Sequence, residues 1–153
     1  MPVAWRLLKT RHLAHAWDGE GARRYGGRWN SPGVPVVYSS ETLALALLEV
    51  LAHLQDSETL AAYSAVRAEF DDSLVSVLPP KTLPDRWRDH PPPPEVTAIG
   101  DRWARSGASG ILRVPSVIVP FEHGYLFNPE HPQFAMIRLG ETIPFPIDSR
   151  LAK

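Results

Sequence analysis

The chain has 153 residues, a formal net charge of −1 and no cysteine. This length suits one domain over residues 1–153, because folding a chain of this size removes about 70% of its unfolded surface from water. The balanced charge argues against a protein built to bind phosphate backbones, so we expect no direct nucleic-acid binding, and the lack of cysteine excludes disulfides, thiolate metal sites and cysteine nucleophiles.

Apolar runs are short along the whole chain. None approaches the roughly 18 consecutive residues that a membrane-spanning helix needs. Charges are scattered through residues 1–17, unlike in a signal peptide. We therefore expect a cytoplasmic protein that makes no membrane contact.

The first half of the chain predicts short strands around one apolar helix. Residues 3–17 are interpreted as a strand entering a short helix, and residues 19–33 as a loop because they contain five glycines. The β-branched run at 34–38 predicts a strand. The two serines that follow it are candidate N-caps for an apolar helix that ends near Leu54.

The middle of the chain contains one ambiguous element and one clear helix. Residues 59–70 fit either state, because their alanines favour a helix while their tyrosine, valine and phenylalanine suit a strand. Residues 73–77 alternate and predict a strand. The prolines at 91–94 predict a rigid spacer, and Pro94 is well placed to open a helix that Gly107 ends.

The C-terminal part predicts two further strands. Residues 111–119 are apolar and β-branched, which predicts a buried strand interrupted at Pro115 and Ser116. Residues 134–145 alternate enough to predict a strand or a hairpin. Together the elements predict an α+β fold, a single mixed domain with short strands.

Glu49 is the most informative residue of the apolar helix. A carboxylate among leucine, alanine and valine side chains is costly unless another group pairs with it or uses it. It can form a local pair with His53, one turn further along the helix. The other interpretation is a carboxylate at the floor of a pocket, whose pKa is set by partial burial and a cationic neighbour.

Two residues before this helix are candidates for ligand binding. In GGRWN, at 26–30, two glycines permit a tight turn and Arg28 offers a planar fork for phosphate or carboxylate, or else pairs with a surface acid. The ring of Tyr38 can cover a flat ligand, or it packs with its hydroxyl bonded. A strand follows GGRWN, so the motif is neither a P-loop nor a Rossmann fingerprint.

Two polar residues stand out in the C-terminal half. Ser116 lies within RVPSVIVP, where its hydroxyl can bond to backbone at a proline-induced irregularity, and no GxSxG elbow surrounds it. Asn128 opens NPEHP, a turn that can position a loop at a site. The six histidines form no HExxH or comparable ligand set, so no metal is expected.

Taken together, these segments resemble the RES domain, a family named for its Arg, Glu and Ser. The matching text is, in order, GGRWNSPGVPVVYSS, the helix with Glu49, WARSG, RVPSVIVP, YLFNPEHP and PFPIDSRL. The resemblance covers nearly the whole chain. It implies a fold similar to that of the diphtheria-toxin-like ADP-ribosyltransferases.

The resemblance also implies a function. RES proteins are toxins of bacterial toxin–antitoxin pairs, which implies cleavage of NAD between nicotinamide and ribose by a glycohydrolase or phosphorylase, with NAD as substrate and no bound cofactor. It assigns catalysis to Glu49 and Arg28. It assigns substrate binding to Arg28, Tyr38 and Ser116, to which the NPEHP turn adds Asn128. The implied partner is an antitoxin with an Xre-like DNA-binding region. Two assemblies stay open, a homodimer of this chain and a hetero-oligomer with the antitoxin.

Two other functions stay open. A mono-ADP-ribosyltransferase would pass the same ADP-ribosyl cation to a protein side chain. A non-catalytic binding module would use Arg28 and Glu49 in structural ion pairs. Incubation with NAD alone separates the enzymes, because only a glycohydrolase or phosphorylase consumes NAD rapidly without a protein target.

Overall fold

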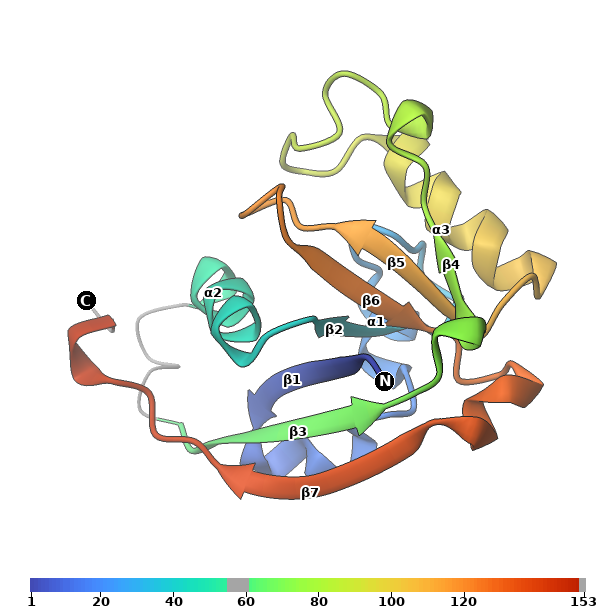
Figure 1. Ribbon diagram of the computed structural model, residues 1–153. Helices are drawn as coiled ribbons and strands as arrows, with labels where there is room; N and C mark the ends of the chain where they lie inside the picture. The colour runs from blue at the N-terminus through green and yellow to red at the C-terminus, as the bar shows by residue number, and fades with distance from the viewer. Residues whose placement is uncertain (55–60, 152–153) are drawn as a thin grey trace.

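A single seven-stranded sheet forms the centre of the protein (Figure 1). The computed structural model describes residues 1–54 and 61–151. The strands are β1 (Val3–Lys9), β2 (Val37–Ser40), β3 (Tyr63–Glu69), β4 (Val75–Val77), β5 (Ile111–Pro115), β6 (His123–Phe127) and β7 (Arg138–Pro144). They lie in the order β4-β5-β6-β2-β1-β3-β7, and every neighbouring pair is antiparallel except β4 and β5.

Short helices connect these strands. The α-helices of the described ranges are α1 (Glu20–Tyr25), α2 (Leu43–His53) and α3 (Pro94–Ser106). The 3-10 helices are η1 (Thr10–His15), η3 (Asp72–Leu74), η4 (Pro80–Thr82), η5 (Pro132–Met136) and η6 (Ser149–Leu151). In this part of the chain no helix has the length and apolar character needed to cross a membrane. The mixture of helices and short strands confirms the predicted α+β class.

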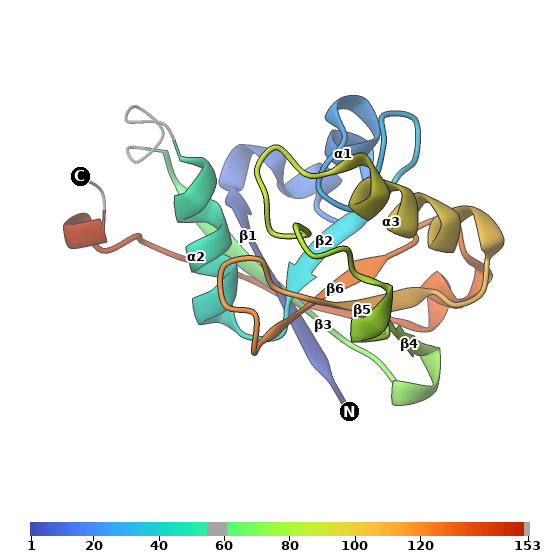
Figure 2. The same cartoon turned by 90° about the horizontal axis from the view of Figure 1, so that it is seen from above.

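The helices α2 and α3 lie over the same face of the sheet. Trp5 of β1 packs in the cluster under α2 and is paired with Ser40 of β2. Tyr38 lies two residues before Ser40, on the same face, and packs in the cluster under α3. Figure 2 shows the segment between η4 and α3 running between these two helices. Tyr38 therefore lies on the face of the sheet that α2 and α3 cover.

The opposite face of the sheet buries an aromatic cluster. Phe70 contacts Tyr125 and Phe127 edge to face, with ring centroids 5.1 and 5.6 Å apart. Trp17 stacks on Phe127 at 5.7 Å. Each aromatic pair stabilises the fold by about 0.5–1.5 kcal/mol beyond the contribution of its buried surface area. This packing joins β6 to the residue that follows β3, on the face of the sheet opposite α2 and α3.

The prediction for the N-terminal region is confirmed at its start and wrong in part thereafter. Residues 3–17 contain β1 followed by η1, as predicted. The predicted loop at 19–33 contains α1, whose two ends are set by Gly19 and Gly26, with φ angles of 70° and 73°, while Gly21 lies inside the helix. Within α1, Glu20 pairs with arginines three and four residues later. Such pairs favour a short helix that glycine content hides.

The predicted N-caps of α2, Ser39 and Ser40, are wrong. Both lie in β2, whose pairing with β6 continues through Ser40. The Ser39 hydroxyl donates to the Tyr125 carbonyl at 2.7 Å. Thr42 caps the helix instead, since its hydroxyl accepts a hydrogen bond from the Leu45 amide at 3.1 Å. The helix itself is confirmed and ends at His53.

Most of the later elements are confirmed. The ambiguous stretch at 59–70 contains strand β3, while residues 59–60 lie outside the described residues. The helix from Pro94 is α3, and Gly107 ends it with a φ of 65°. The strands predicted at 73–77 and 134–145 are present in shortened form as β4 and β7, each beginning soon after a 3-10 helix.

The predicted strand at 111–119 is wrong beyond Pro115, and β6 was not predicted. Strand β5 ends at Pro115, where Ser116 begins a loop that leads to β6. The sequence pattern does not predict β6, because the strand contains Gly124 and glycine is unfavourable in strand interiors. Glycine is needed at position 124 for a steric reason, because a Cβ atom there would lie 2.9 Å from the Ser39 carbonyl oxygen on the neighbouring strand.

Candidate active site

Glu49 and Ser116 meet where α2 approaches the end of β5. Glu49 is half-buried, and its Oε1 accepts a hydrogen bond from the Ser116 hydroxyl at 3.2 Å. Ser116 is only 5% exposed and directly follows the last residue of β5. The two residues are 67 positions apart in the chain. The fold therefore joins the acid and the hydroxyl that the family resemblance assigns to one site.

The Glu49 carboxyl has an altered pKa. Burial raises this pKa above its usual value, because surroundings of low dielectric disfavour the charged form. The hydrogen bond from Ser116, and then the charges of His53 and Arg28, act in the opposite direction. His53 thus influences Glu49 through its charge, while the described hydrogen bond comes from Ser116. The carboxylate has partial burial and a cationic neighbour, which are two features of the pocket interpretation, and the pocket itself stays a prediction.

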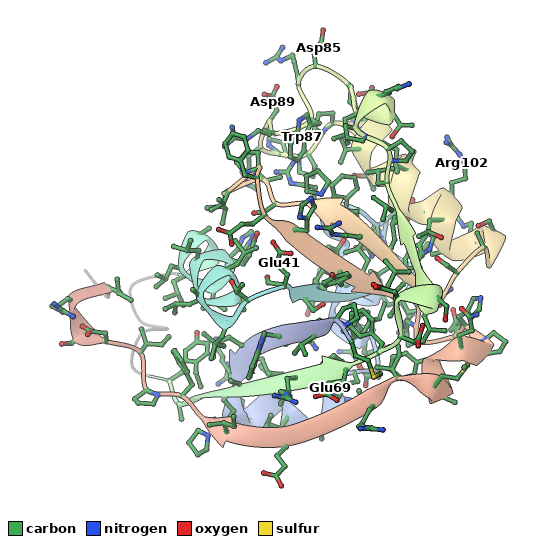
Figure 3. All side chains as sticks on the ribbon, viewed as in Figure 1. Glu41, Glu69, Asp85, Trp87, Asp89 and Arg102 are labelled. Carbon is green, nitrogen blue, oxygen red and sulfur yellow. The ribbon has the colours of Figure 1, made fainter. Side chains whose placement is uncertain are left out.

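Arg28 lies within electrostatic reach of Glu49 and is held by backbone carbonyls. Its Nη1 donates to the carbonyls of Trp87 at 2.9 Å and Asp89 at 3.0 Å. Figure 3 shows Trp87 and Asp89 on the segment between η4 and α3. Burial lowers the pKa of Arg28, and the Glu49 carboxylate is the first of the charges that oppose this shift. The acid and the arginine therefore sense each other's charge on one side of the molecule.

One face of α3 holds the backbone of the Arg28 loop, residues 26–31. Thr97 Oγ1 donates to the Arg28 carbonyl at 3.1 Å. The Asp101 carboxylate accepts from the Ser31 amide at 2.8 Å and from the Ser31 hydroxyl at 2.6 Å. Between them, a Cβ atom on Gly100 would lie 1.7 Å from a carbonyl oxygen of the loop. Positions 97, 100 and 101 share one helix face, so α3 contacts the loop directly.

The Tyr38 hydroxyl is bonded to the same loop. It donates to Asn30 Oδ1 at 2.5 Å and accepts from the Trp29 amide at 3.0 Å. Burial raises the pKa of Tyr38, so the phenol keeps its proton at neutral pH. The hydroxyl is therefore bonded to protein, as the packing interpretation predicts, and the covering of a ligand by the ring stays a prediction.

The Ser116 hydroxyl bonds to backbone, as one interpretation of the sequence predicts, and it also contacts Glu49. Its Oγ accepts hydrogen bonds from the amides of Ile118 and Val119, both at 3.1 Å. Those two bonds fix the oxygen, and its own proton is directed to Glu49 Oε1. The turn after β5 therefore orients the hydroxyl toward the acid.

The structure does not bring Asn128 to this cluster. Its Nδ2 donates to the Ala104 carbonyl at 3.1 Å, and its Oδ1 accepts from the Glu130 amide at 3.0 Å. Asn128 follows the last residue of β6, while Ser116 lies near the first. The five residues of β6 separate them by about 17 Å. Asn128 thus joins the end of α3 to a turn at the opposite end of the hairpin.

Sequence reasoning misses three residues that build this site. Asn30 is 1% exposed inside the quoted GGRWN motif, and Thr97 and Asp101 lie on a helix that was predicted only as an element. An amide side chain inside a glycine-rich loop is a usable signal, because buried loop carbonyls need donors. The spacing of Thr97 and Asp101 is a second signal, since polar residues four apart on a helix can serve one loop.

Two cavities border this cluster: Asp101 lines one of them, and Trp87 and Pro115 line the other. One of about 500 Å³ runs along α3, and one of about 450 Å³ lies beside β4, β5 and the segment after η4. Neither is lined by Arg28, Glu49 or Ser116. Within the described ranges, no group of three or more acidic, histidine or cysteine side chains is placed to hold a metal ion.

The charges of the cluster suit a particular kind of ligand. A guanidinium binds phosphate or carboxylate through parallel hydrogen bonds. A carboxylate stabilises positive charge that develops beside it, most strongly where water is scarce. The pair Arg28 and Glu49 can therefore hold an anionic molecule while it gains positive charge at another atom.

The sequence is similar to proteins that carry functional names. A family model described as the RES domain matches residues 3–148. The chain is 39% identical over 150 residues to a Yersinia enterocolitica protein named Toxin Res, covering 97% of this chain and 99% of the relative. It is 34% identical over 154 residues to a Sphingobium protein named Prs ADP-ribosylating toxin, covering 97% and 96%.

A third relative comes from Mycobacterium tuberculosis and is named NAD(+) phosphorylase MbcT. It is 43% identical over 47 residues, which are 30% of this chain and 25% of the relative. The crystal structure of the M. tuberculosis MbcT–MbcA toxin–antitoxin complex matches with a TM-score of 0.74 at 21% identity, covering 94% of this chain and 84% of that chain. Similarity at this level shows a shared fold.

Proposed function

Because the chain belongs to the RES domain family, we propose that it is the toxin of a type II toxin–antitoxin pair and cleaves NAD between nicotinamide and ribose. The names of the Yersinia and Sphingobium relatives support a toxin, and the name of MbcT supports NAD as substrate. The observation that carries the proposal is the setting of Glu49, which is half-buried, bonded to Ser116 and influenced by the charge of Arg28.

The proposed role of Glu49 follows from the chemistry of the bond. Nicotinamide in NAD is already cationic, so it leaves without being protonated. As it leaves, positive charge develops on the ribose, as in other glycosidic cleavages. A carboxylate beside that ribose stabilises the charge, and Ser116 keeps the Glu49 carboxylate oriented toward it.

Arg28 is proposed to hold the pyrophosphate of NAD. Its described hydrogen bonds to protein use Nη1 alone. A guanidinium has five N–H donors, so within the described part of the chain Nε and Nη2 are available for an anion. The ring of Tyr38 is proposed to cover nicotinamide or ribose, as the family resemblance implies, while its hydroxyl stays bonded to the Arg28 loop.

The acceptor of the ADP-ribosyl cation distinguishes the candidate reactions. Water gives a glycohydrolase and phosphate gives a phosphorylase, and the name of MbcT favours phosphate. The name of the Sphingobium relative favours transfer to a protein. A non-catalytic module is the candidate of another class, in which Arg28 and Glu49 have structural roles only.

The proposed partner is an antitoxin protein. The structural match to MbcT in complex with the antitoxin MbcA supports it. The resemblance to RES proteins adds the expectation that this antitoxin has an Xre-like DNA-binding region, so that DNA contacts the antitoxin rather than this chain. Co-expression with an antitoxin that binds this chain should abolish toxicity and yield a hetero-oligomer that size-exclusion chromatography with light scattering can measure.

The test is to incubate purified protein with NAD, with and without phosphate, and to identify the product by mass spectrometry. Free ADP-ribose supports hydrolysis, and its phosphorylated form supports phosphorolysis. Consumption of NAD that requires an added bacterial extract, with mass added to a protein, favours the transferase. Absence of NAD binding by calorimetry together with harmless expression favours the non-catalytic module.

Glu49→Gln tests the proposed catalytic group. We expect this variant to fold and bind NAD, but to lose about 10²- to 10³-fold in turnover because it lacks the stabilising charge. Glu141→Gln, on the exposed edge strand β7, is the matched control and should retain activity. Consumption of NAD by Glu49→Gln at the wild-type rate contradicts the assignment.

A further inference from the structure

We propose that the Tyr38 hydroxyl and the Asn30 amide form a tether that positions Arg28, so that Asn30 is a positioning residue of the site. The tether is the chain of two hydrogen bonds from Asn30 through Tyr38 to the Trp29 amide. Its effect on NAD rests on the proposed function, whereas its existence does not. The Tyr38 hydroxyl is then part of the support for the Arg28 loop and not a ligand of the substrate.

The orientation of the Asn30 amide is determined by its surroundings. Asn30 is 1% exposed, and its Nδ2 lies 2.9 Å from the Ala22 carbonyl, 2.9 Å from the Val34 carbonyl and 3.3 Å from the Ser31 carbonyl. Carbonyls only accept hydrogen bonds, so the NH₂ group must face them. The amide oxygen therefore points toward Tyr38.

This orientation decides which way the Tyr38 proton points. Asn30 Oδ1 can only accept, so the Tyr38 hydroxyl donates to it. A lone pair of the same oxygen accepts from the amide of Trp29, the residue after Arg28. The bonds thus link the buried Asn30 to the backbone next to Arg28.

Gly27 supplies independent evidence for the tether. A Cβ atom on this glycine would lie 2.6 Å from the Tyr38 hydroxyl oxygen and 3.0 Å from Asn30 Oδ1. The second glycine of GGRWN is therefore needed for the loop to approach the phenol. The loop also crowds the hydroxyl, which leaves it bonded to protein on both sides.

The tether and the guanidinium contacts act on different parts of Arg28. The tether fixes the backbone of the loop through Trp29, and the carbonyls of Trp87 and Asp89 fix Nη1. Loss of the tether leaves the guanidinium contacts in place but frees the backbone that carries them. We therefore expect weaker substrate binding and a largely preserved chemical step.

Tyr38→Phe is the direct test, because it keeps the ring and removes only the hydroxyl. Tyr125→Phe is the matched control: Tyr125 lies on the neighbouring strand β6, and its ring packs edge to face on Phe70, on the face of the sheet opposite Tyr38. The first measurement is hydrogen exchange of the Trp29 amide by NMR. We expect exchange at least about tenfold faster in Tyr38→Phe, because the amide loses its acceptor, and no change in the control.

The second measurement is the kinetics of NAD consumption. We expect the KM of Tyr38→Phe to rise about 10- to 100-fold, since small displacements of a positioning group have effects of this size. Turnover should stay within about threefold of wild type, because Arg28 binds the ground state and the transition state alike. A general loss of structure would reduce turnover as well.

Asn30→Asp is the second variant. It keeps the shape of the side chain but places an oxygen against three carbonyls. We therefore expect faster Trp29 amide exchange and a higher KM for NAD than in Tyr38→Phe. Unchanged Trp29 exchange in Tyr38→Phe overturns the tether. Faster exchange with an unchanged KM overturns the positioning role. If wild-type protein consumes no NAD, the proposed function fails, and Trp29 exchange still decides whether the tether exists.

Discussion

The two charged groups of the candidate site are held in different ways. Glu49 projects from α2, and its described hydrogen bond is a single one, from Ser116. Arg28 lies in a loop whose backbone is bonded to Thr97 and, through the next residue, to Tyr38. A helix satisfies most of its own backbone groups, whereas a loop needs partners from elsewhere. The Arg28 loop therefore depends on hydrogen bonds from other elements, whereas α2 itself supplies the backbone hydrogen bonds around Glu49.

This difference separates stability from chemistry. Substitutions in the hydrogen-bond network of the Arg28 loop leave buried donors and acceptors without partners, which lowers the free energy of unfolding. Substitutions of Glu49 alter a charge that is already disfavoured by burial. We expect variants of the first kind to unfold more easily and variants of the second kind to stay folded but lose activity.

Gly100→Ala should have the largest effect on stability. Its Cβ atom would lie 1.7 Å from the Trp29 carbonyl oxygen, so α3 must move away from the Arg28 loop. We expect a loss of about 3 kcal/mol in the free energy of unfolding, measured by urea denaturation. Gly21→Ala is the control, because no atom lies within 4 Å of its Cβ position in α1. Equal stability of the two variants would mean that α3 does not contact the loop.

Asp101→Ala should have the next largest effect. It removes the acceptor of the Ser31 amide and hydroxyl, and we expect a loss of about 2 kcal/mol in the free energy of unfolding. Arg102→Ala, an exposed change at the next position of α3, should stay within about 0.5 kcal/mol of wild type. A larger effect of Arg102→Ala than of Asp101→Ala would contradict the hydrogen-bond network of the Arg28 loop.

Ser116→Ala should have a smaller effect on stability and a specific effect on pH dependence. The loss of the turn contacts should cost about 1 kcal/mol. The hydrogen bond from Ser116 lowers the pKa of Glu49, so its removal raises that pKa further. If ionised Glu49 is required, the acid limb of kcat/KM for NAD should move to higher pH. An unmoved acid limb would show that another group controls it.

Glu49→Gln should have the smallest effect on stability, with the opposite sign. Burial raises the pKa of Glu49 above its usual 4.5, so proton-linked stability is full below pH 4.5 and is lost as the pH rises through the raised value. Glutamine avoids that loss, and at pH 7 we expect the variant to be more stable by about 0.5 kcal/mol. Thermal unfolding at pH 7 and pH 4 checks this, because the advantage should vanish at pH 4.

Local sequence signals predict some of these elements and mislead for others. The apolar run before Leu54 and the Pro94 to Gly107 pattern predict α2 and α3, because periodicity and helix ends are properties of neighbouring residues. The same rules misplace the cap of α2 and miss β6. In both cases the deciding contact comes from another strand: β2 extends through Ser40 because β6 pairs with it, and Gly124 is there because Ser39 approaches closely.

By itself, the sequence determined the α+β class and the unusual carboxylate of Glu49, because composition, periodicity and a charge in an apolar helix are all local. Only the tertiary structure decided which polar groups meet. It joined Glu49 to Ser116 across 67 positions, bonded the Tyr38 hydroxyl to the Arg28 loop and separated Asn128 from both. Such contacts depend on strand order and on the packing of α3, which link segments that no local pattern connects.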